Sequence, residues 1–226
     1  MARSVIVTGG FGVLGQAVSE AFAARGDKVA RVDFAPAPHG PIDGVLDIGG
    51  VDLTNAAATE AALARVVAAH GGIDVLVNVA GGFTWETLEG GSIDTWARMQ
   101  SMNLISNVTI TKLALAELAR SASGRIVNIG AGAAIKAGMG MGAYAASKSG
   151  VHRLTEALSE EVSGQGITVN AILPSIIDTP TNRADMPDAD FSQWVQPAAI
   201  ADVILFLASD AARAVTGALI PVARGG

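Results

Sequence analysis

Two residues four positions apart, Tyr144 and Lys148, could carry proton-transfer chemistry in this chain. A spacing of four places both side chains on one face of a helix, with the ammonium group near the phenol. A neighbouring positive charge favours the phenolate, so we expect Lys148 to lower the pKa of Tyr144 from about 10 towards the working range of a general acid or base. The pair is therefore the predicted centre of proton transfer.

A glycine-rich turn follows the first apolar run of the chain and leads directly into a helical pattern. Glycines permit a tight turn and a close approach of the backbone to a ligand, and the N-terminus of the following helix attracts the negative charge of a pyrophosphate. Strand, glycine turn and helix in this order predict a dinucleotide site. The residues expected to contact the cofactor there are Gly9, Phe11, Gly12, Val13, Leu14 and Gly15.

Asp33 ends the second apolar run, eighteen residues after Gly15. A carboxylate at this point of a dinucleotide-binding fold accepts hydrogen bonds from the adenosine ribose, and it repels a 2′-phosphate. We therefore expect NAD to be the preferred cofactor. NADP stays possible, because the guanidinium groups of Arg3 and Arg31 could approach the same pocket.

Short β-branched runs alternate with longer segments rich in Ala and Leu along the whole chain. The predicted strands cover residues 4–8, 28–32, 73–77, 125–129, 167–173 and 218–222, with a weaker candidate at 45–53. The predicted helices cover residues 15–25, 55–70, 92–120, 143–163 and 197–208. This alternation predicts an α/β Rossmann fold, a doubly wound and mostly parallel sheet of seven strands with helices on both faces.

The 226 residues, half of them apolar, suffice for one large core, so we expect a single domain over residues 1–226. A net charge of −6 offers no basic stripe for a nucleic-acid backbone. No apolar stretch reaches the roughly 20 residues of a membrane span. The three histidines are scattered and cysteine is absent, so no metal site is expected. A cytoplasmic protein that acts on a small molecule is predicted.

The pattern of Tyr144 and Lys148 resembles the YxxxK signature of the short-chain dehydrogenases/reductases. It follows a predicted strand at the head of a helix, downstream of the glycine turn, so the resemblance covers essentially the whole chain. It implies hydride transfer between nicotinamide and a small carbonyl or alcohol, with Tyr144 as acid/base and Lys148 also binding the ribose. Asn103 matches the family residue that holds a water for proton relay. A helix–helix hydrogen bond is the alternative role for Asn103.

The same resemblance implies further contacts with the cofactor at three places. The positions that it carries over are Asn78, Ala80 and Gly81 on the ribose side, Asp52 and Leu53 near the adenine, and Pro174, Ile177 and Thr179 at the nicotinamide. The family also implies a homo-oligomer, a dimer or a tetramer, paired through the helices at 92–120 and 143–163 or through the last strand.

Two departures from the family pattern bear on the chemistry. Val13 replaces a glycine of the usual turn, although Gly12 supplies an alternative spacing that should keep phosphate binding. More consequential is the segment 127–134, about thirteen residues before Tyr144, which carries no hydroxyl where the family has its catalytic serine. Without a donor to the carbonyl oxygen, ordinary ketone reduction should weaken by about 2–4 kcal/mol.

The missing serine and the residues after position 178 look like dihydropteridine reductase, a family member whose pattern also lacks that serine. A quinonoid pterin is already electron-poor, so Tyr144 need only supply a proton. Three functions therefore stay open: a reductase or dehydrogenase of small carbonyls and alcohols, a pterin reductase, and a cofactor-binding sensor or structural protein without turnover. Residues 181–196 fit neither periodicity and are the predicted substrate lid.

Overall fold

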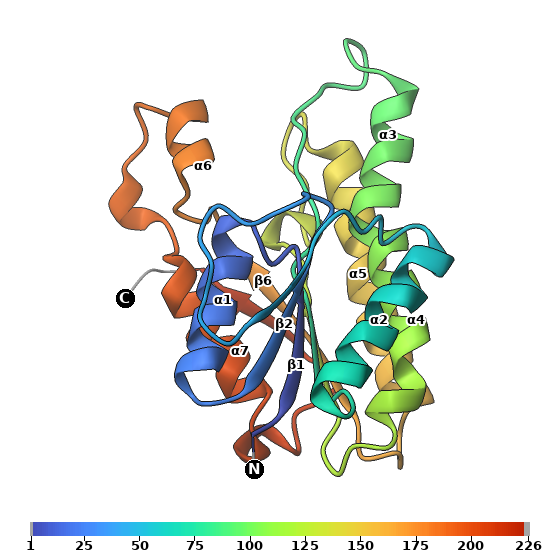
Figure 1. Cartoon of the computed structure of the whole chain (residues 1–226). Coiled ribbons are helices and arrows are strands. Elements are labelled where there is room, and N and C mark those ends of the chain that lie inside the picture. Colours follow the sequence, from blue (N-terminus) through green and yellow to red (C-terminus); the bar gives the residue numbers. More distant parts are fainter. Residues whose placement is uncertain (1, 224–226) are drawn as a thin grey trace.

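Seven parallel strands form one sheet, in the order β3-β2-β1-β4-β5-β6-β7, in the computed structural model, which describes residues 2–223 (Figure 1). The strands are β1 (Ser4–Thr8), β2 (Lys28–Val32), β3 (Leu46–Ile48), β4 (Val75–Asn78), β5 (Arg125–Ile129), β6 (Thr168–Pro174) and β7 (Leu219–Val222). The predicted doubly wound Rossmann fold, with one domain and seven parallel strands, is confirmed.

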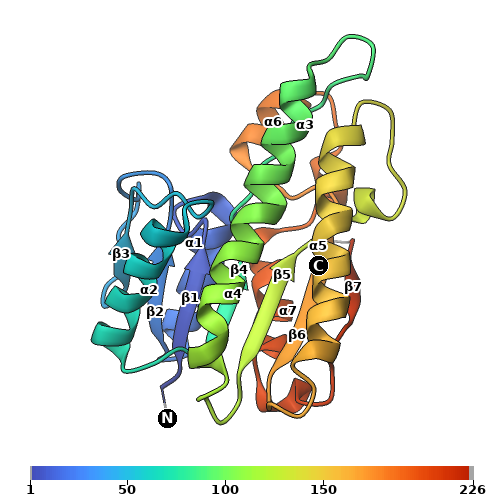
Figure 2. The same cartoon turned by 90° about the vertical axis from the view of Figure 1, so that its right-hand side faces the viewer.

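Helices cover both faces of the sheet, as Figures 1 and 2 show. One face is covered by α1 (Val13–Ala24) and α7 (Pro197–Leu207), and the other by α2 (Ala56–His70), α4 (Ser106–Leu118) and α5 (Gly142–Glu161). Two shorter helices, α3 (Ile93–Met99) and α6 (Pro180–Asp185), lie above the carboxyl ends of the strands.

The apolar runs of the strands are explained by this double cover. In β1 the side chains of Val5 and Val7 join the core under α1 and α7, whereas Ile6 joins the core under α2 and α4. All five residues of β1 are buried. Because the inner strands β1, β4, β5 and β6 are buried on both faces, the sequence shows continuous apolar runs there rather than the alternation of a half-exposed sheet.

The predicted helix over residues 92–120 is wrong in one respect. A π-helical turn, Gln100–Ile105, separates α3 from α4, so the helix contains a wider turn in its middle. Such turns occur mostly inside α-helices and often at functional sites. The weaker strand candidate at 45–53 is shorter than expected, since only Leu46–Ile48 pair with β2. The other element bounds move by one or two residues.

The carboxyl ends of β1 and β4 lie side by side, and this is where the order of the strands along the chain reverses. Helices leave such neighbouring strands on opposite faces of the sheet, which opens a crevice that binds ligands in folds of this type. The glycine turn follows β1, and the segment Val79–Gly82 follows β4. The topology therefore brings the two predicted cofactor segments to one edge.

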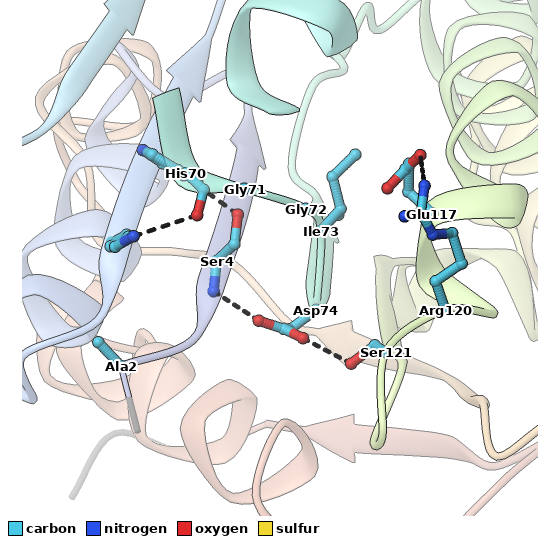
Figure 3. A pocket seen from close by; sticks show the side chains of 11 residues that line it. Ala2, Ser4, His70, Gly71, Gly72, Ile73, Asp74, Glu117, Arg120 and Ser121 are labelled. Atoms are coloured by element: carbon cyan, nitrogen blue, oxygen red, sulfur yellow. Dashed lines mark hydrogen bonds and ion pairs between the residues drawn. The ribbon is translucent and has the colours of Figure 1, made fainter. Parts of the chain in front are cut away.

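Two cavities lie at the opposite edge, where the strands begin. The first, of about 240 Å³, is shown in Figure 3, where Ser4 Oγ lies 3.1 Å from His70 Nδ1. Asp74 accepts hydrogen bonds from the Ser4 N–H (2.8 Å) and the Ser121 hydroxyl (2.5 Å) rather than from His70. These groups hold β1, α2 and β4 together. The second cavity, of about 520 Å³, surrounds Thr168 and other residues at the start of β5 and β6.

None of the helices in the described residues has the length and apolar character that crossing a bilayer requires.

Candidate active site

The glycine turn between β1 and α1 is shaped by close approaches of the backbone. Gly9 has a φ of 61°, and a Cβ there would lie 2.9 Å from the Cα of Ala80. A Cβ on Gly15 would collide with the carbonyl oxygen of Gly9. Val13 begins α1 with its side chain 45% exposed, so the valine takes no room from the turn. The result is a cradle free of side chains at a helix N-terminus, which fits a pyrophosphate.

Asp33 lies beside this turn at the end of β2. Its Oδ2 accepts a hydrogen bond from the Phe11 N–H (2.9 Å), and its Oδ1 accepts one from the Ala35 N–H (2.9 Å). The carboxylate is therefore held at the glycine turn by backbone donors. Each oxygen keeps a further lone pair, so the group can still accept hydrogen bonds from ribose hydroxyls.

The two arginines that kept NADP open have other partners. Arg31 is completely buried and forms a two-pronged ion pair with Asp47, with nitrogen-to-oxygen distances of 2.7 and 2.9 Å. It also donates to Gln16 and to the carbonyl of Gly40. Arg3 donates to the carbonyl of Ser123 (2.7 Å) at the edge of the sheet where the strands begin. These contacts hold both guanidinium groups in place, and that of Arg31 also lies 5.3 Å from the centroid of the Phe11 ring in the glycine turn. The preference for NAD therefore stays a prediction.

Tyr144 and Lys148 lie in the first two turns of α5, as the sequence predicts. Lys148 is 5% exposed, and its Nζ donates to the carbonyl oxygen of Ile129 at the end of β5 (2.7 Å). The ring of Tyr144 meets the ring of Phe83 edge to face, with centroids 5.0 Å apart and an interplanar angle of 86°. The helix face is thus fixed to β5 on one side and to the segment after β4 on the other.

Asn103 lies in the π-helical turn and is 1% exposed. Its Oδ1 accepts a hydrogen bond from the Gly82 N–H (2.9 Å), and its Nδ2 donates to the Gly82 carbonyl (3.1 Å) and to Ser147 Oγ (3.0 Å). A Cβ on Gly81 would lie 2.5 Å from Asn103 Oδ1 and 3.4 Å from Lys148 Nζ. Three predicted residues, Gly81, Asn103 and Lys148, therefore meet at one point. The sequence left two roles open for Asn103, a proton relay through water or a hydrogen bond between helices. The bond to Ser147 in α5 is a hydrogen bond of the second kind.

Burial dominates the electrostatics of this pair. It raises the pKa of Tyr144 to about 12 and lowers the pKa of Lys148 to about 8. The expectation that Lys148 lowers the pKa of Tyr144 is therefore wrong for this structure, because removal from water disfavours both charged forms. Near neutral pH the phenol keeps its proton, and most Lys148 side chains carry a charge.

Further residues that the sequence analysis did not assign to the site lie around Tyr144 and Lys148. Ala131 is buried where the family has its serine, and its N–H donates to His152 Nε2 (3.3 Å). Trp85 covers Gly140 so closely that a Cβ there would overlap the indole ring, and the Glu86 N–H bonds to the Gly140 carbonyl (2.8 Å). The segment after β4 is therefore tied to the loop before α5. The exposed apolar rings at these positions were visible in the sequence, but nothing there separated them from packing residues.

The residues predicted at the nicotinamide follow the end of β6. Pro174 is the last residue of that strand, and Ile177 pairs with Val195 in an isolated bridge. The Ile177 carbonyl accepts a hydrogen bond from Asn182 Nδ2 (2.8 Å), and Thr179 Oγ1 caps the start of α6 by accepting one from the Asn182 N–H (3.1 Å). The segment enters α6 at the carboxyl edge of the sheet, on the same side as the glycine turn.

The remaining predicted contacts have local structural roles. Asn78 is buried in β4, and its Nδ2 donates to Asn128 Oδ1 (2.9 Å). Asp52 is exposed and accepts hydrogen bonds from Thr54, whereas Leu53 belongs to the core. The predicted lid over residues 181–196 is not free of regular structure, because it contains most of α6 and a short 3₁₀ turn, Phe191–Gln193.

A family model described as short chain dehydrogenase matches residues 3–190. The chain belongs to the short-chain dehydrogenase family. It is 30% identical over 235 residues to the 3-oxoacyl-acyl-carrier-protein reductase FabG of Vibrio cholerae, with 99% of this chain and 96% of that protein covered. It is 32% identical over 243 residues to the 2,5-dichloro-2,5-cyclohexadiene-1,4-diol dehydrogenase LinX of Sphingobium indicum, with 99% and 95% covered.

A solved structure extends the likeness to three dimensions. The ligand-free aldohexose dehydrogenase of Thermoplasma acidophilum matches with a TM-score of 0.89 and 28% identity, covering 98% of this chain and 92% of that one. Family membership establishes NAD(P)-dependent oxidoreduction as the general activity. The finer likeness to dihydropteridine reductase is not confirmed by these relatives, which act as reductases and dehydrogenases of other compounds.

Replacing Lys148 by Met should raise the free energy of unfolding near pH 7, because the variant no longer buries an ammonium group. The increase in the free energy of unfolding should be about 1–3 kcal/mol. The loss of the hydrogen bond from Lys148 to the Ile129 carbonyl reduces this increase. The pKa of Lys148 falls from 10.5 in the unfolded chain to about 8 in the folded protein, so the folded state binds fewer protons in that window. The wild type is therefore stabilised as the pH rises from 8 to 10.5, and the advantage of the variant should shrink.

Urea unfolding of both proteins at about pH 7 and pH 9.5 measures the difference. Lys112→Met, on the exposed side of α4, is the matched control and should show no such pH dependence. A Lys148→Met protein that is less stable than the wild type at pH 7, with a difference that does not change with pH, would contradict the prediction.

Proposed function

We propose that the chain transfers a hydride between NAD and the carbonyl or alcohol carbon of a small organic substrate, with Tyr144 as the general acid/base. The observation that carries this proposal is the meeting of Gly81, Asn103 and Lys148 beside the Tyr144 face of α5, at the edge where the glycine turn lies. When bound, the nicotinamide supplies or accepts the hydride. The residues of the chain bind, orient and move the proton.

The proton chemistry follows from the burial of the pair. With its pKa raised to about 12, Tyr144 holds its proton at neutral pH, so the protonated form, the one that can donate to a substrate oxygen or nitrogen, is the form present. The Lys148 ammonium group donates one hydrogen bond to the Ile129 carbonyl oxygen. Its other N–H groups remain available to a ribose hydroxyl of the bound cofactor. Asn103 fixes the segment after β4 beside Lys148.

The contacts of the two arginines support NAD over NADP. Asp33 lies at the end of β2, where it would repel a 2′-phosphate, while Arg31 is held inside the protein by Asp47. A 2′-phosphate needs a cation in place of the carboxylate. The guanidinium of Arg31 lies over the Phe11 ring but is paired with Asp47, and Arg3 lies at the other edge of the sheet.

Residues 181–196 are proposed to cover the bound substrate. Figure 1 shows α6 and the segment after it standing above the carboxyl ends of the strands. Arg183 forms an ion pair with Asp178 (2.6 Å) and lies over the ring of Phe191, 4.7 Å from its centroid. Trp194 is buried at the far end. The segment is thus anchored at both ends and exposed between them, as a lid requires.

A homo-oligomer is proposed through the surface of α3, α4 and α5, which faces the viewer in Figure 2. Ile93 is 80% exposed there, and Trp96 and Ile105 are also exposed. Large apolar side chains that gather on one exposed face mark an association surface.

Tyr144→Phe should lower kcat for substrate reduction by about 10²- to 10⁴-fold, because it removes the proton donor and leaves the ring. Binding of NADH, followed by its fluorescence, should change little. The substrate panel contains 3-oxoacyl esters, cyclic diols, simple ketones and quinonoid dihydropterin. Full activity of the variant would disprove the proposed mechanism. Tight NADH binding by a wild type that turns over none of these compounds would favour the sensor function instead.

The wild type should bind NADH at least about tenfold more tightly than NADPH, since Asp33 accepts from the ribose and repels the phosphate. Asp33→Ala should reduce the ratio of the NADPH to the NADH dissociation constant, mainly by weakening NADH binding. Asp43→Ala, an exposed carboxylate in the loop between β2 and β3, is the control and should keep the ratio. Equal affinities of the wild type for the two cofactors, measured by calorimetry, would refute the assignment.

Ala131→Ser should raise kcat/KM for unactivated ketones by about tenfold to a hundredfold, because a hydroxyl there can donate to the developing oxyanion. Reduction of quinonoid dihydropterin, which needs less polarisation, should change far less. Ala133→Ser places a hydroxyl in the same turn as a control and should bring no gain. If Ala131→Ser leaves the ketone rates unchanged, another group already supplies the donor.

A further inference from the structure

The helix face that carries Tyr144 and Lys148 continues one turn further to His152. The three residues are spaced by four along α5, so their side chains project from the same face. The imidazole is 3% exposed and lies against the end of β5. The mechanism proposed above makes no use of it.

His152 contacts the backbone at the place where the family serine is missing. Its Nε2 accepts a hydrogen bond from the Ala131 N–H (3.3 Å). A Cβ on Gly130 would lie 2.5 Å from the same nitrogen, so the imidazole fills the space that a side chain would need. One turn earlier, Lys148 holds the Ile129 carbonyl (2.7 Å). Successive turns of α5 therefore hold the residues on either side of Gly130.

The contact with Ala131 requires a particular form of the imidazole. Nε2 can accept a hydrogen bond only when it carries no proton, which means a neutral ring with its hydrogen on Nδ1. Burial lowers the pKa of His152, and the charges of Arg153 and Lys148 lower it further, whereas Glu156 raises it. These charged groups all belong to α5. The ring is therefore neutral at pH 7 and becomes charged only in acid.

We propose that neutral His152 is a positioning residue, which holds Gly130 and Ala131 against α5 and so sets the substrate side of the site relative to Tyr144 and Lys148. This role rests on the function proposed above. It requires no contact of His152 with substrate or cofactor. A proton on Nε2 would point at the Ala131 N–H and push the end of β5 away from the helix.

The pH profile of kcat/KM tests this role, measured with whichever compound of the panel is reduced. In the wild type we expect an acid limb below about pH 6.5, where kcat/KM falls about tenfold for each pH unit. His152→Gln keeps an acceptor that does not titrate, so the limb should move to the lower pH at which carboxylates titrate. His39→Gln, in an exposed loop, is the control and should keep the wild-type limb. The same acid limb in His152→Gln would overturn the proposal.

Nitrogen chemical shifts of the histidine rings in the wild type provide a test that needs no variant. The expected result is the Nδ1–H form of His152 at pH 7.5, with a titration that coincides with the acid limb. An Nε2–H form would overturn the proposal even if the variant failed to fold. Failure of every substrate at every pH would instead contradict the proposed function, so the two failures are distinguishable.

Discussion

The buried side chain of Asn128 holds together the elements on which the site depends. Its Oδ1 accepts hydrogen bonds from Asn78 in β4 (2.9 Å) and Asn107 in α4 (3.1 Å), and its Nδ2 donates to Thr155 in α5 (2.9 Å). An unmade bond inside the core would cost far more than one at the surface, so these partners are effectively obligatory. Because α4 continues the π-helical turn and α5 carries Tyr144 and Lys148, this amide ties together the elements that carry the candidate site.

The layered fold could be predicted from the sequence, and much of the detail of the site could not. Strands buried on both faces leave continuous apolar runs, and those runs need no knowledge of distant contacts. Arg31 is held by an ion pair with Asp47, which lies sixteen residues away on the next strand. The residues around Arg31 in the sequence do not reveal this partner, so they suggested only a cation near the ribose. The raised pKa of Tyr144 depends on how deeply the ring is buried, which spacing alone does not reveal. A place for His152 on the same helix face as Tyr144 and Lys148 could have been predicted from the sequence, because the three residues are spaced by four.

Under the proposed function, the site joins a phenol that keeps its proton at neutral pH to a position that lacks the family's serine hydroxyl. A phenol whose pKa is about 12 is a weak acid, and the buried residue at the family's serine position is Ala131, whose methyl group cannot donate a hydrogen bond. Two large aromatic side chains, Phe83 and Trp85, are exposed near Tyr144 and Gly140, and under the proposed function they would offer apolar contact to a substrate.

The π-helical turn has a consequence for how the two ends of the helix from Ile93 to Leu118 can vary. A helix advances by 3.6 residues per turn, so one residue more or less rotates everything beyond it by roughly 100°. The apolar stripe of Ile110, Ala114 and Leu118 is fixed by the core, whereas α3 buries a separate pair of residues, Thr95 and Met99. The π-helical turn holds one residue more per turn than an α-helix, so it changes the rotation of α3 about the helix axis relative to α4. Insertions or deletions before Asn103 can therefore change the orientation of α3 while the buried stripe of α4 keeps its own.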